Sequence, residues 1–243
     1  MNYKVCIGHK VKTIKKGKGI LVLESDDYTA KEIKDIKAKG YKVLGYLSIG
    51  TLEKYRPWYK DLKHLRKKQL PDWPDEYYVD YTRKEWQTFL QDRAKAIMAK
   101  GFSGLWLDNL DVYEELKLKS GLVACFSMLK KLKDIGKYTM VNGGSLFWER
   151  CLEKGIRLKT IVTAVTQEEV FSRITNYEGT GKFGKQYAGQ SNYYRKLLID
   201  LHKRGVQTFP FEYTRSVSLK ETVKAWCKET GMTGYYIAED VRL

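Results

Sequence analysis

The sequence alternates between short apolar runs and longer amphipathic stretches, and this alternation restricts the chain to few folds. Polar turn residues follow most of the apolar runs, and a helical pattern that ends at a glycine then follows. Repeated strand–helix units predict a parallel sheet, because each helix returns the chain to the sheet in the same direction. Nine runs fit a strand, namely residues 3–7, 20–23, 43–47, 77–79, 104–107, 139–142, 161–165, 206–211 and 235–238.

Eight strand–helix units that close into a barrel suit a chain of 243 residues. The predicted fold is therefore α/β, a single (β/α)8 TIM barrel with one extra strand, and the weakest candidates are residues 3–7 and 77–79. One domain is expected over 1–243, in which residues 1–18 form an N-terminal strand and a basic loop. An open doubly wound sheet is the alternative, although no G-x-G-x-x-G or P-loop motif follows any run. Residues 56–73 and 172–189 are predicted to be long loops.

Polar side chains stand where each predicted strand ends. Because ligands bind at the carboxyl edge of parallel sheets, these residues make up the candidate site. Asp108 and Asn109 have a second interpretation, as caps of the next element through side-chain hydrogen bonds. The set is Glu24, Ser48, Asp80, Asp108, Asn109, Asp111, Asn142, Glu168, Glu169, Glu212 and Tyr213.

This set is made of acids, amides and hydroxyls, and its residue types limit the chemistry. A Schiff-base enzyme needs a lysine at the strand ends and a zinc hydrolase needs His or Cys, so neither class is indicated. No cofactor and no metal are predicted, although oxygen ligands of this kind also suit Mg²⁺ or Ca²⁺. Two carboxyl groups that divide the roles of proton donor and nucleophile or base are the machinery of glycoside hydrolysis.

The chain carries 45 Lys and Arg against 29 Asp and Glu, a net charge of +16. Such an excess suits an anionic polymer or cell surface, or else it marks a lysine-rich solvated surface. The four cysteines form no C-x-x-C pair, which predicts buried thiols. Neither a signal peptide nor an apolar run of about 18 residues is visible. We expect a soluble, cytoplasmic protein, or a secreted one if a leader has been removed.

Three blocks in order resemble the TIM-barrel domain of glycoside hydrolase family 114, whose founding activity is endo-α-1,4-polygalactosaminidase and whose fold is shared by a branch of uncharacterised bacterial proteins. They are residues 43–56 (VLGYLSIGTLEKYR), 101–111 (GFSGLWLDNLD) and 167–171 (QEEVF). The resemblance runs from about residue 20 to the C-terminus. It implies an endo-acting glycosidase that degrades a polysaccharide.

The resemblance also implies roles for individual residues. The catalytic pair maps to Asp108 as nucleophile and Glu168 as acid/base in a retaining mechanism, with Glu169 as the alternative to Glu168. Substrate contacts are expected from Tyr46, Ser48, Asn109, Asp111, Tyr113, Asn142, Glu169 and Tyr213. Supporting roles are expected from Glu24, Glu53, Arg56 and Asp80, among which Glu53 and Arg56 are predicted to form an ion pair.

The net charge disagrees with the family's founding substrate, which is a cationic galactosamine polymer. A strongly basic cleft would repel that polymer, so an N-acetylated or anionic glycan is expected from the sequence. Two other functions remain open. One is a carbohydrate-binding barrel without turnover. The other, less favoured, is a nucleic-acid-binding protein that uses the Lys-, Arg- and Trp-rich segment 54–73, whose binding would weaken steeply with salt.

Overall fold

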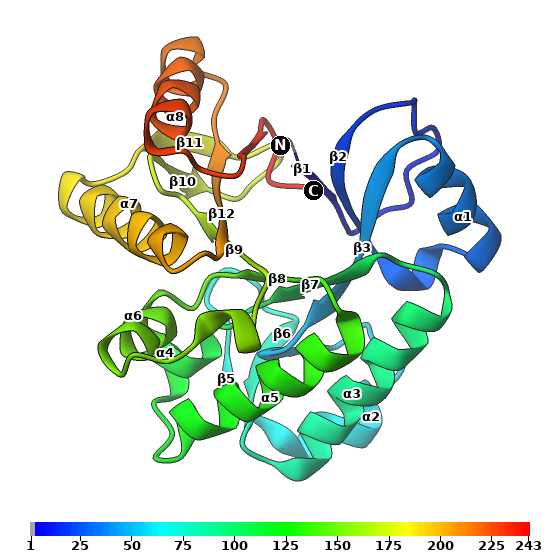
Figure 1. Ribbon diagram of the computed structural model, residues 1–243. Helices are drawn as coiled ribbons and strands as arrows, with labels where there is room; N and C mark the ends of the chain where they lie inside the picture. Colours follow the sequence, from blue (N-terminus) through cyan, green and yellow to red (C-terminus); the bar gives the residue numbers. More distant parts are fainter. Residues whose placement is uncertain (1–2) are drawn as a thin grey trace.

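A parallel eight-stranded sheet curls into a nearly closed barrel at the centre of the computed structural model, which describes residues 3–243 (Figure 1). Each pair of neighbouring strands is parallel. In sheet order the strands are β1 (Tyr3–Cys6), β2 (Gly19–Leu23), β3 (Tyr41–Ser48), β7 (Gly104–Asp108), β8 (Thr139–Asn142), β9 (Ala164–Glu168), β12 (Gln207–Tyr213) and β13 (Tyr236–Ala238). The fold is the predicted TIM barrel.

Helices surround the strands on the outside (Figure 1). Their apolar faces and the outward side chains of the strands make one core, and a second core of mostly inward side chains, including Trp106 and Phe209, fills the barrel. The helices are α1 (Ala30–Ala38), α2 (Tyr59–Leu62), α3 (Lys84–Ala99), α4 (Val112–Leu116), α5 (Gly121–Gly136), α6 (Ser145–Glu153), α7 (Ala188–Lys203) and α8 (Val217–Thr230). Among residues 3–243, no helix is long and apolar enough to cross a lipid bilayer.

The extra strand of the prediction lies outside the barrel. Residues 77–79 belong to β6 (Glu76–Val79), which pairs antiparallel with β4 (Thr51–Glu53) and β5 (Arg66–Gln69). Residues 3–7, the other doubtful candidate, supply β1. The candidate at 161–165 is shifted, because β9 begins at Ala164 after a short 3-10 turn (Leu158–Thr160).

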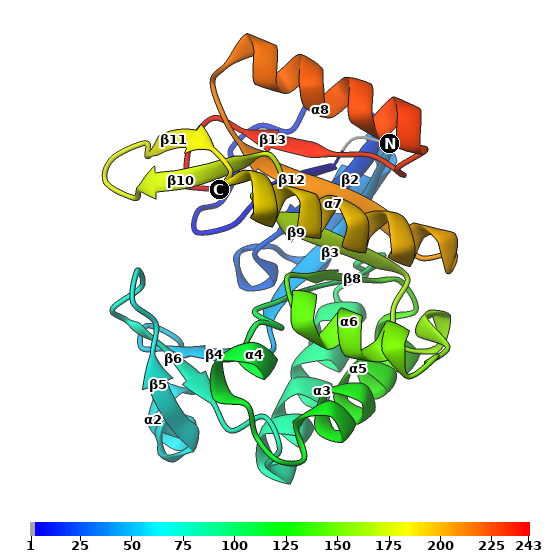
Figure 2. The ribbon, with the colours of Figure 1, turned by 90° about the vertical axis from the view of Figure 1, so that its left-hand side faces the viewer.

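The two segments predicted as long loops contain regular structure. Residues 56–73 include α2 and β5, and residues 172–189 include the hairpin of β10 (Ser172–Asn176) and β11 (Lys182–Lys185). The hydrophobic periodicity of the sequence does not indicate either segment, because their strands are short, polar and partly exposed. The three-stranded sheet follows β3 and the hairpin follows β9, so both lie over the carboxyl ends of the barrel strands, at the left of Figure 2.

Candidate active site

Asp108, Asn142 and Glu168 end three neighbouring strands of the barrel, β7, β8 and β9. The backbone register sets Leu107 beside Val141, and Asn142 beside Thr166. Side chains of equal parity along parallel strands point to the same side of the sheet. The three polar side chains therefore meet at the carboxyl edge, as the sequence predicts for the strand ends.

The Asp108 carboxylate is half-buried and accepts three hydrogen bonds. Its Oδ1 receives the Asn109 backbone N–H at 2.9 Å and the Asn142 amide at 2.9 Å, and its Oδ2 receives the Tyr46 hydroxyl at 3.2 Å. Burial raises the pKa of Asp108, and these three donors act in the opposite direction because they stabilise the charged form. The site thus holds an acid whose ionised form has dedicated partners.

The amide of Asn142 joins the two carboxyl groups. Its Nδ2 donates to Asp108 Oδ1 at 2.9 Å and to Glu168 Oε1 at 2.6 Å. Asn142 is 6 % exposed, and its own Oδ1 is buried without a hydrogen-bond partner. A buried unpaired acceptor is uncommon and costs free energy. The two carboxyl groups are therefore held together by an amide whose other end has no hydrogen-bond partner among the described residues.

Glu168 is the second carboxyl group of the pair. Its Oε2 is bonded to the Tyr213 hydroxyl at 3.0 Å, and the Tyr213 ring stacks on Phe211 inside the barrel. Burial, followed by the nearby charge of Asp108, raises the pKa of Glu168 to about 8. A carboxyl group with that pKa keeps its proton near neutral pH, which suits a proton donor.

Glu169, the alternative to Glu168, lies in a different environment. Its backbone has φ +57, a left-handed conformation that is rare for a residue with a long side chain. Its carboxylate accepts the backbone N–H of Ile174 in the β10 strand, and its carbonyl oxygen accepts the Gln186 amide at 2.9 Å. The turn therefore directs Glu168 toward Asp108 and Glu169 toward the hairpin.

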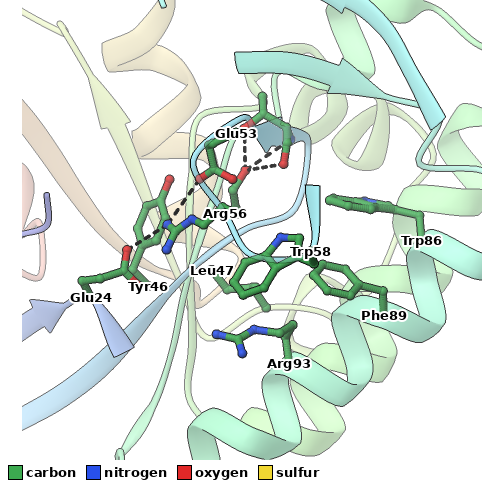
Figure 3. A pocket seen from close by; sticks show the side chains of 11 residues that line it. Glu24, Tyr46, Leu47, Glu53, Arg56, Trp58, Trp86, Phe89 and Arg93 are labelled. Carbon is green, nitrogen blue, oxygen red and sulfur yellow. Dashed lines mark hydrogen bonds and ion pairs between the residues drawn. The ribbon is translucent and has the colours of Figure 1, made fainter. Parts of the chain in front are cut away.

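A second layer of charged groups supports Tyr46 (Figure 3). Arg56 pairs with Glu24 at 2.8 Å and with Glu53 at 3.3 Å, and its guanidinium lies 5.9 Å from the centroid of the Tyr46 ring. Glu53 is 3 % exposed, and burial raises its pKa, opposed by Arg56. The predicted Glu53–Arg56 ion pair is thus present, and Glu24 is its third member. The Trp58 ring packs against the Arg56 guanidinium.

Ser48 and Asn109 bond to one another and to Thr51 at the start of β4. Asn109 Nδ2 donates to Ser48 Oγ at 3.0 Å and to Thr51 Oγ1 at 3.1 Å, and Ser48 Oγ lies 2.7 Å from Thr51 Oγ1. These bonds occupy both polar side chains within the protein. The structure therefore gives them a positioning role, holding the β3–β4 turn against Asp108.

Glu76, at the start of β6, is a site residue that the strand-end argument missed. Thr51 Oγ1 donates to Glu76 Oε2 at 3.3 Å, which connects it to the Asn109 network. Burial, then Glu53 and Asp108, raises the pKa of Glu76 to about 8. Glu76 belongs to the three-stranded antiparallel sheet and not to a barrel strand. The only sequence signals for its role are the polar Thr51 and the acidic residue itself.

Asp111, Tyr113 and Asp80 make no hydrogen bond to Asp108 or Glu168 among those found within residues 3–243. Asp111 Oδ1 accepts the Gly144 N–H at 2.8 Å at the start of α6, and burial raises its pKa to about 7. The Tyr113 ring packs edge-on against Phe147. Asp80 accepts the Thr82 hydroxyl at 2.5 Å in the turn after β6, away from the barrel strand ends.

Glu212 carries another buried carboxyl group, fully enclosed beneath the hairpin. It accepts the N–H groups of Phe171 at 3.1 Å and Ser172 at 2.8 Å, and the Ser172 hydroxyl at 2.6 Å. Burial raises its pKa to about 7. Its contacts anchor the start of β10. Within residues 3–243, no group of three or more His, Cys, Asp and Glu side chains is arranged to hold a metal ion.

Acidic and aromatic side chains also line a hollow of about 690 Å³ between the two insertions. Asp72 comes from the β5–β6 turn, Glu169 directly follows β9, and Tyr177 and Glu178 lie in the turn of the hairpin. Trp73 meets Tyr177 edge-on, with ring centroids 5.8 Å apart, so the insertions touch through two half-exposed rings. The carboxyl edge of the barrel thus carries a concentration of acids in a chain of high positive charge.

A (β/α)8 barrel with two half-buried carboxyl groups, joined by one amide at its carboxyl edge, has the layout of a glycoside hydrolase. Residues 1–239 match the model of glycoside-hydrolase family GH114, and the chain belongs to that family. A segment of 96 residues, 37 % of the chain, is 31 % identical to uncharacterised proteins of Thermotoga maritima and Methanocaldococcus jannaschii. It spans 30 % and 28 % of those proteins.

Solved structures share the fold over nearly the whole chain. The glycoside hydrolase domain of PelA from Pseudomonas aeruginosa matches with a TM-score of 0.79 and 17 % identity, covering 99 % of this chain and 96 % of that domain. Aspergillus fumigatus Ega3, solved with galactosamine, matches with a TM-score of 0.71 and 14 % identity, covering 97 % and 90 %. At these identities the matches establish a common architecture.

Proposed function

We propose that this protein hydrolyses an amino-sugar polysaccharide with Asp108 and Glu168 as its catalytic pair. The observation that carries the proposal is the Asn142 amide, which bonds to both carboxyl groups at 2.9 and 2.6 Å. Because both acceptor oxygens bond to one nitrogen, they lie less than about 5.5 Å apart, which favours the close carboxyl spacing of retaining glycosidases. Inverting enzymes need a wider gap to admit a water molecule.

The raised pKa of Glu168 supports the following roles for the pair. Glu168, whose pKa is raised to about 8, gives its proton to the departing glycosidic oxygen while Asp108 attacks the anomeric carbon. Glu168 then takes a proton from the water that breaks the glycosyl–Asp108 ester. The Tyr213 hydroxyl can stay bonded to Glu168 in both protonation states of the carboxyl group, because a phenol both donates and accepts hydrogen bonds.

Local charge supports a cationic substrate, in contrast to the expectation from the net charge. Glu76 lies near Glu53 and Asp108, and these neighbours add to burial in raising its pKa to about 8. A substrate ammonium among such carboxyls relieves their mutual repulsion and favours their ionised forms. Asp72 and Glu178 extend the acidic lining along the hollow. A polymer with free amino groups, of the kind that the family resemblance implies, fits this surface better than an anionic or N-acetylated glycan.

The test is the release of reducing ends from a panel of deacetylated amino-sugar, N-acetylated, neutral and acidic polysaccharides. The wild type is expected to cleave a deacetylated polymer, with retained anomeric configuration in NMR of the first product. Asp108→Asn and Glu168→Gln are expected to fold and to lose turnover, whereas Asp92→Asn on the exposed side of α3 serves as the matched control. Folded protein that binds glycans without cleaving any of them would refute the proposal and favour a binding barrel.

A further inference from the structure

The wall formed by β1 and β2 lacks the helix that usually covers a strand pair in this fold. Residues 7–18 connect the two strands as a loop with no helix, and Figure 1 shows this loop beside α1. The inward side chains of the strands join the barrel interior, whereas Cys6 and Leu21 belong to the outer core. The loop therefore stands in for a helix over an apolar surface.

The loop is fixed in place at three points. Val11 N–H donates to the Tyr28 hydroxyl at 2.9 Å, Lys39 Nζ donates to the Ile14 carbonyl at 2.8 Å, and Gly17 N–H donates to the Lys39 carbonyl at 3.0 Å. Gly17 has no room for a side chain, because a Cβ there would lie 2.1 Å from the Tyr41 hydroxyl oxygen. These contacts give the loop a defined inner surface.

A cavity of about 270 Å³ remains between the loop and the two strands. This volume corresponds to roughly nine water molecules in the liquid. Its lining is apolar at the strands and cationic at the rim, and it consists of Tyr3, Lys4, Cys6, Val11, Thr13, Ile14, Lys15, Lys18, Ile20, Leu21 and Tyr41. Small-molecule sites have this mixture of apolar walls and a few polar groups that fix orientation.

The charge at the rim is uncompensated. Lys4, Lys15 and Lys18 are exposed, and within residues 3–243 none of the three forms an ion pair or a side-chain hydrogen bond. Lys10 on the same loop, by contrast, pairs with Glu32 at 2.6 Å. Nothing acidic lines the described cavity. Three ammonium groups beside an apolar hollow attract an anion that carries an apolar tail, since the tail excludes water and strengthens the charge interaction.

We propose that this cavity binds a small anionic amphiphile, a carboxylate or phosphate monoester on a chain of about eight carbons. The tail occupies the space against Cys6 and Leu21, and the head lies between the lysines at the rim. The cavity is on the outer wall of the barrel, so it is separate from the catalytic pair. The lysines at the rim thus bind a defined ligand, and this binding does not depend on the proposed hydrolase activity.

Isothermal titration calorimetry with octyl phosphate, below its micelle concentration, tests the site on the whole chain. We expect saturable binding of octyl phosphate and octanoate, and at least tenfold weaker binding of inorganic phosphate and of neutral octyl glucoside. Equal affinity for octyl phosphate and phosphate, or for octyl phosphate and octyl glucoside, would overturn the proposal. Full binding by the Asp108→Asn variant is expected, which separates this result from the fate of the proposed reaction.

Matched variants distinguish the cavity from general attraction to lysines. Lys15→Glu with Lys18→Glu changes two lining residues, whereas Lys12→Glu with Lys16→Glu makes the same charge change on the same loop outside the lining. The first pair is expected to weaken octyl phosphate binding at least tenfold and the second less than twofold. An equal loss in both pairs would refute the cavity.

A volume change and a vesicle experiment complete the test. Thr13→Trp places a large ring at the cavity without altering charge and is expected to abolish octyl phosphate binding while the melting temperature is kept. Co-sedimentation with phosphatidylglycerol vesicles, but no binding of octyl phosphate, would overturn the proposal and identify the lysines as a membrane contact instead.

Discussion

Replacing Asn142 with alanine probes how the two carboxyl groups are held together. The amide donates to Asp108 and to Glu168, and both bonds lower the pKa of the group that accepts them. A hydrogen bond to a charged group contributes about 1.5–3 kcal/mol, and about 1.4 kcal/mol corresponds to one pKa unit. Loss of the amide should therefore raise both pKa values and lower turnover about 10- to 100-fold.

The sign of the pH effect follows from the proposed roles. Turnover requires ionised Asp108 and protonated Glu168, so both limbs of the kcat/KM profile should move to higher pH in Asn142→Ala. The profile is measured by reducing-end release on the deacetylated polymer, with Asn192→Ala on the surface of α7 as the matched amide control. Lost activity with limbs that stay at the wild-type pH would refute the reasoning and point to a direct contact between Asn142 and substrate.

Three further variants test the surroundings of the pair. Glu168→Gln should raise the melting temperature at pH 8 by about 2–4 °C or more but change it little at pH 5. The reason is that the unfolded state binds fewer protons at this residue than the folded state between pH 4.5 and about 8, so wild-type stability falls as the pH rises. An equal gain in melting temperature at both pH values would contradict this explanation. Glu76→Gln should reduce kcat/KM on deacetylated polymer about tenfold relative to kcat/KM on partly N-acetylated polymer. This factor corresponds to the loss of about 1.4 kcal/mol in one charged contact. An unchanged ratio of the two kcat/KM values would show that Glu76 does not take part in substrate recognition. Gly143→Ala should lower the free energy of unfolding by more than about 2 kcal/mol in a denaturant titration, because the new Cβ would lie 2.2 Å from Asp111 Oδ2 and the backbone φ is positive. Gly155→Ala is the control, since Gly155 has a similar φ but open space around it, and it should cost only about 1 kcal/mol.

The barrel could be predicted from sequence because its signals are local and repeated. A buried parallel strand such as β7 reads as a continuous apolar run, and a carboxylate at its end stands at the ligand-binding edge whatever the loops do. The T-A-K-E pattern at residues 29–32 predicts a capping box, and the box is present, with Thr29 accepting the Glu32 N–H and Glu32 accepting the Thr29 N–H. The S-L-K-E pattern at residues 218–221 predicts a second box, and this prediction is wrong, because Ser216 rather than Ser218 caps α8.

The parts that sequence reasoning missed depend on contacts between distant segments. Glu76 becomes a site residue only because β6 folds over the carboxyl end of β3, and nothing in its own neighbourhood encodes that placement. A serine before an apolar helical pattern predicts an N-cap at Ser191, but α7 begins three residues earlier, at Ala188, and Ser191 is buried within the helix. Net charge is likewise a sum over the chain, and it does not record that acids such as Asp72, Glu169 and Glu178 gather around one hollow.

The closure between β1 and β13 has a consequence for how the barrel opens. At this seam, Ile7 N–H donates to the Leu243 carbonyl, and no strand ladder is formed among the described residues; the Tyr3 ring instead packs against Phe209, Phe211 and Tyr236 across the interior. Most other strand junctions must break several backbone hydrogen bonds, whereas this one is held by one backbone hydrogen bond, the bond from the Tyr236 hydroxyl to the Val5 carbonyl at 3.4 Å, and the packing of the Tyr3 ring. Amide protons of β1 should therefore exchange with solvent through local opening at a lower free energy than those of β7, and the barrel has a built-in line along which it comes apart first.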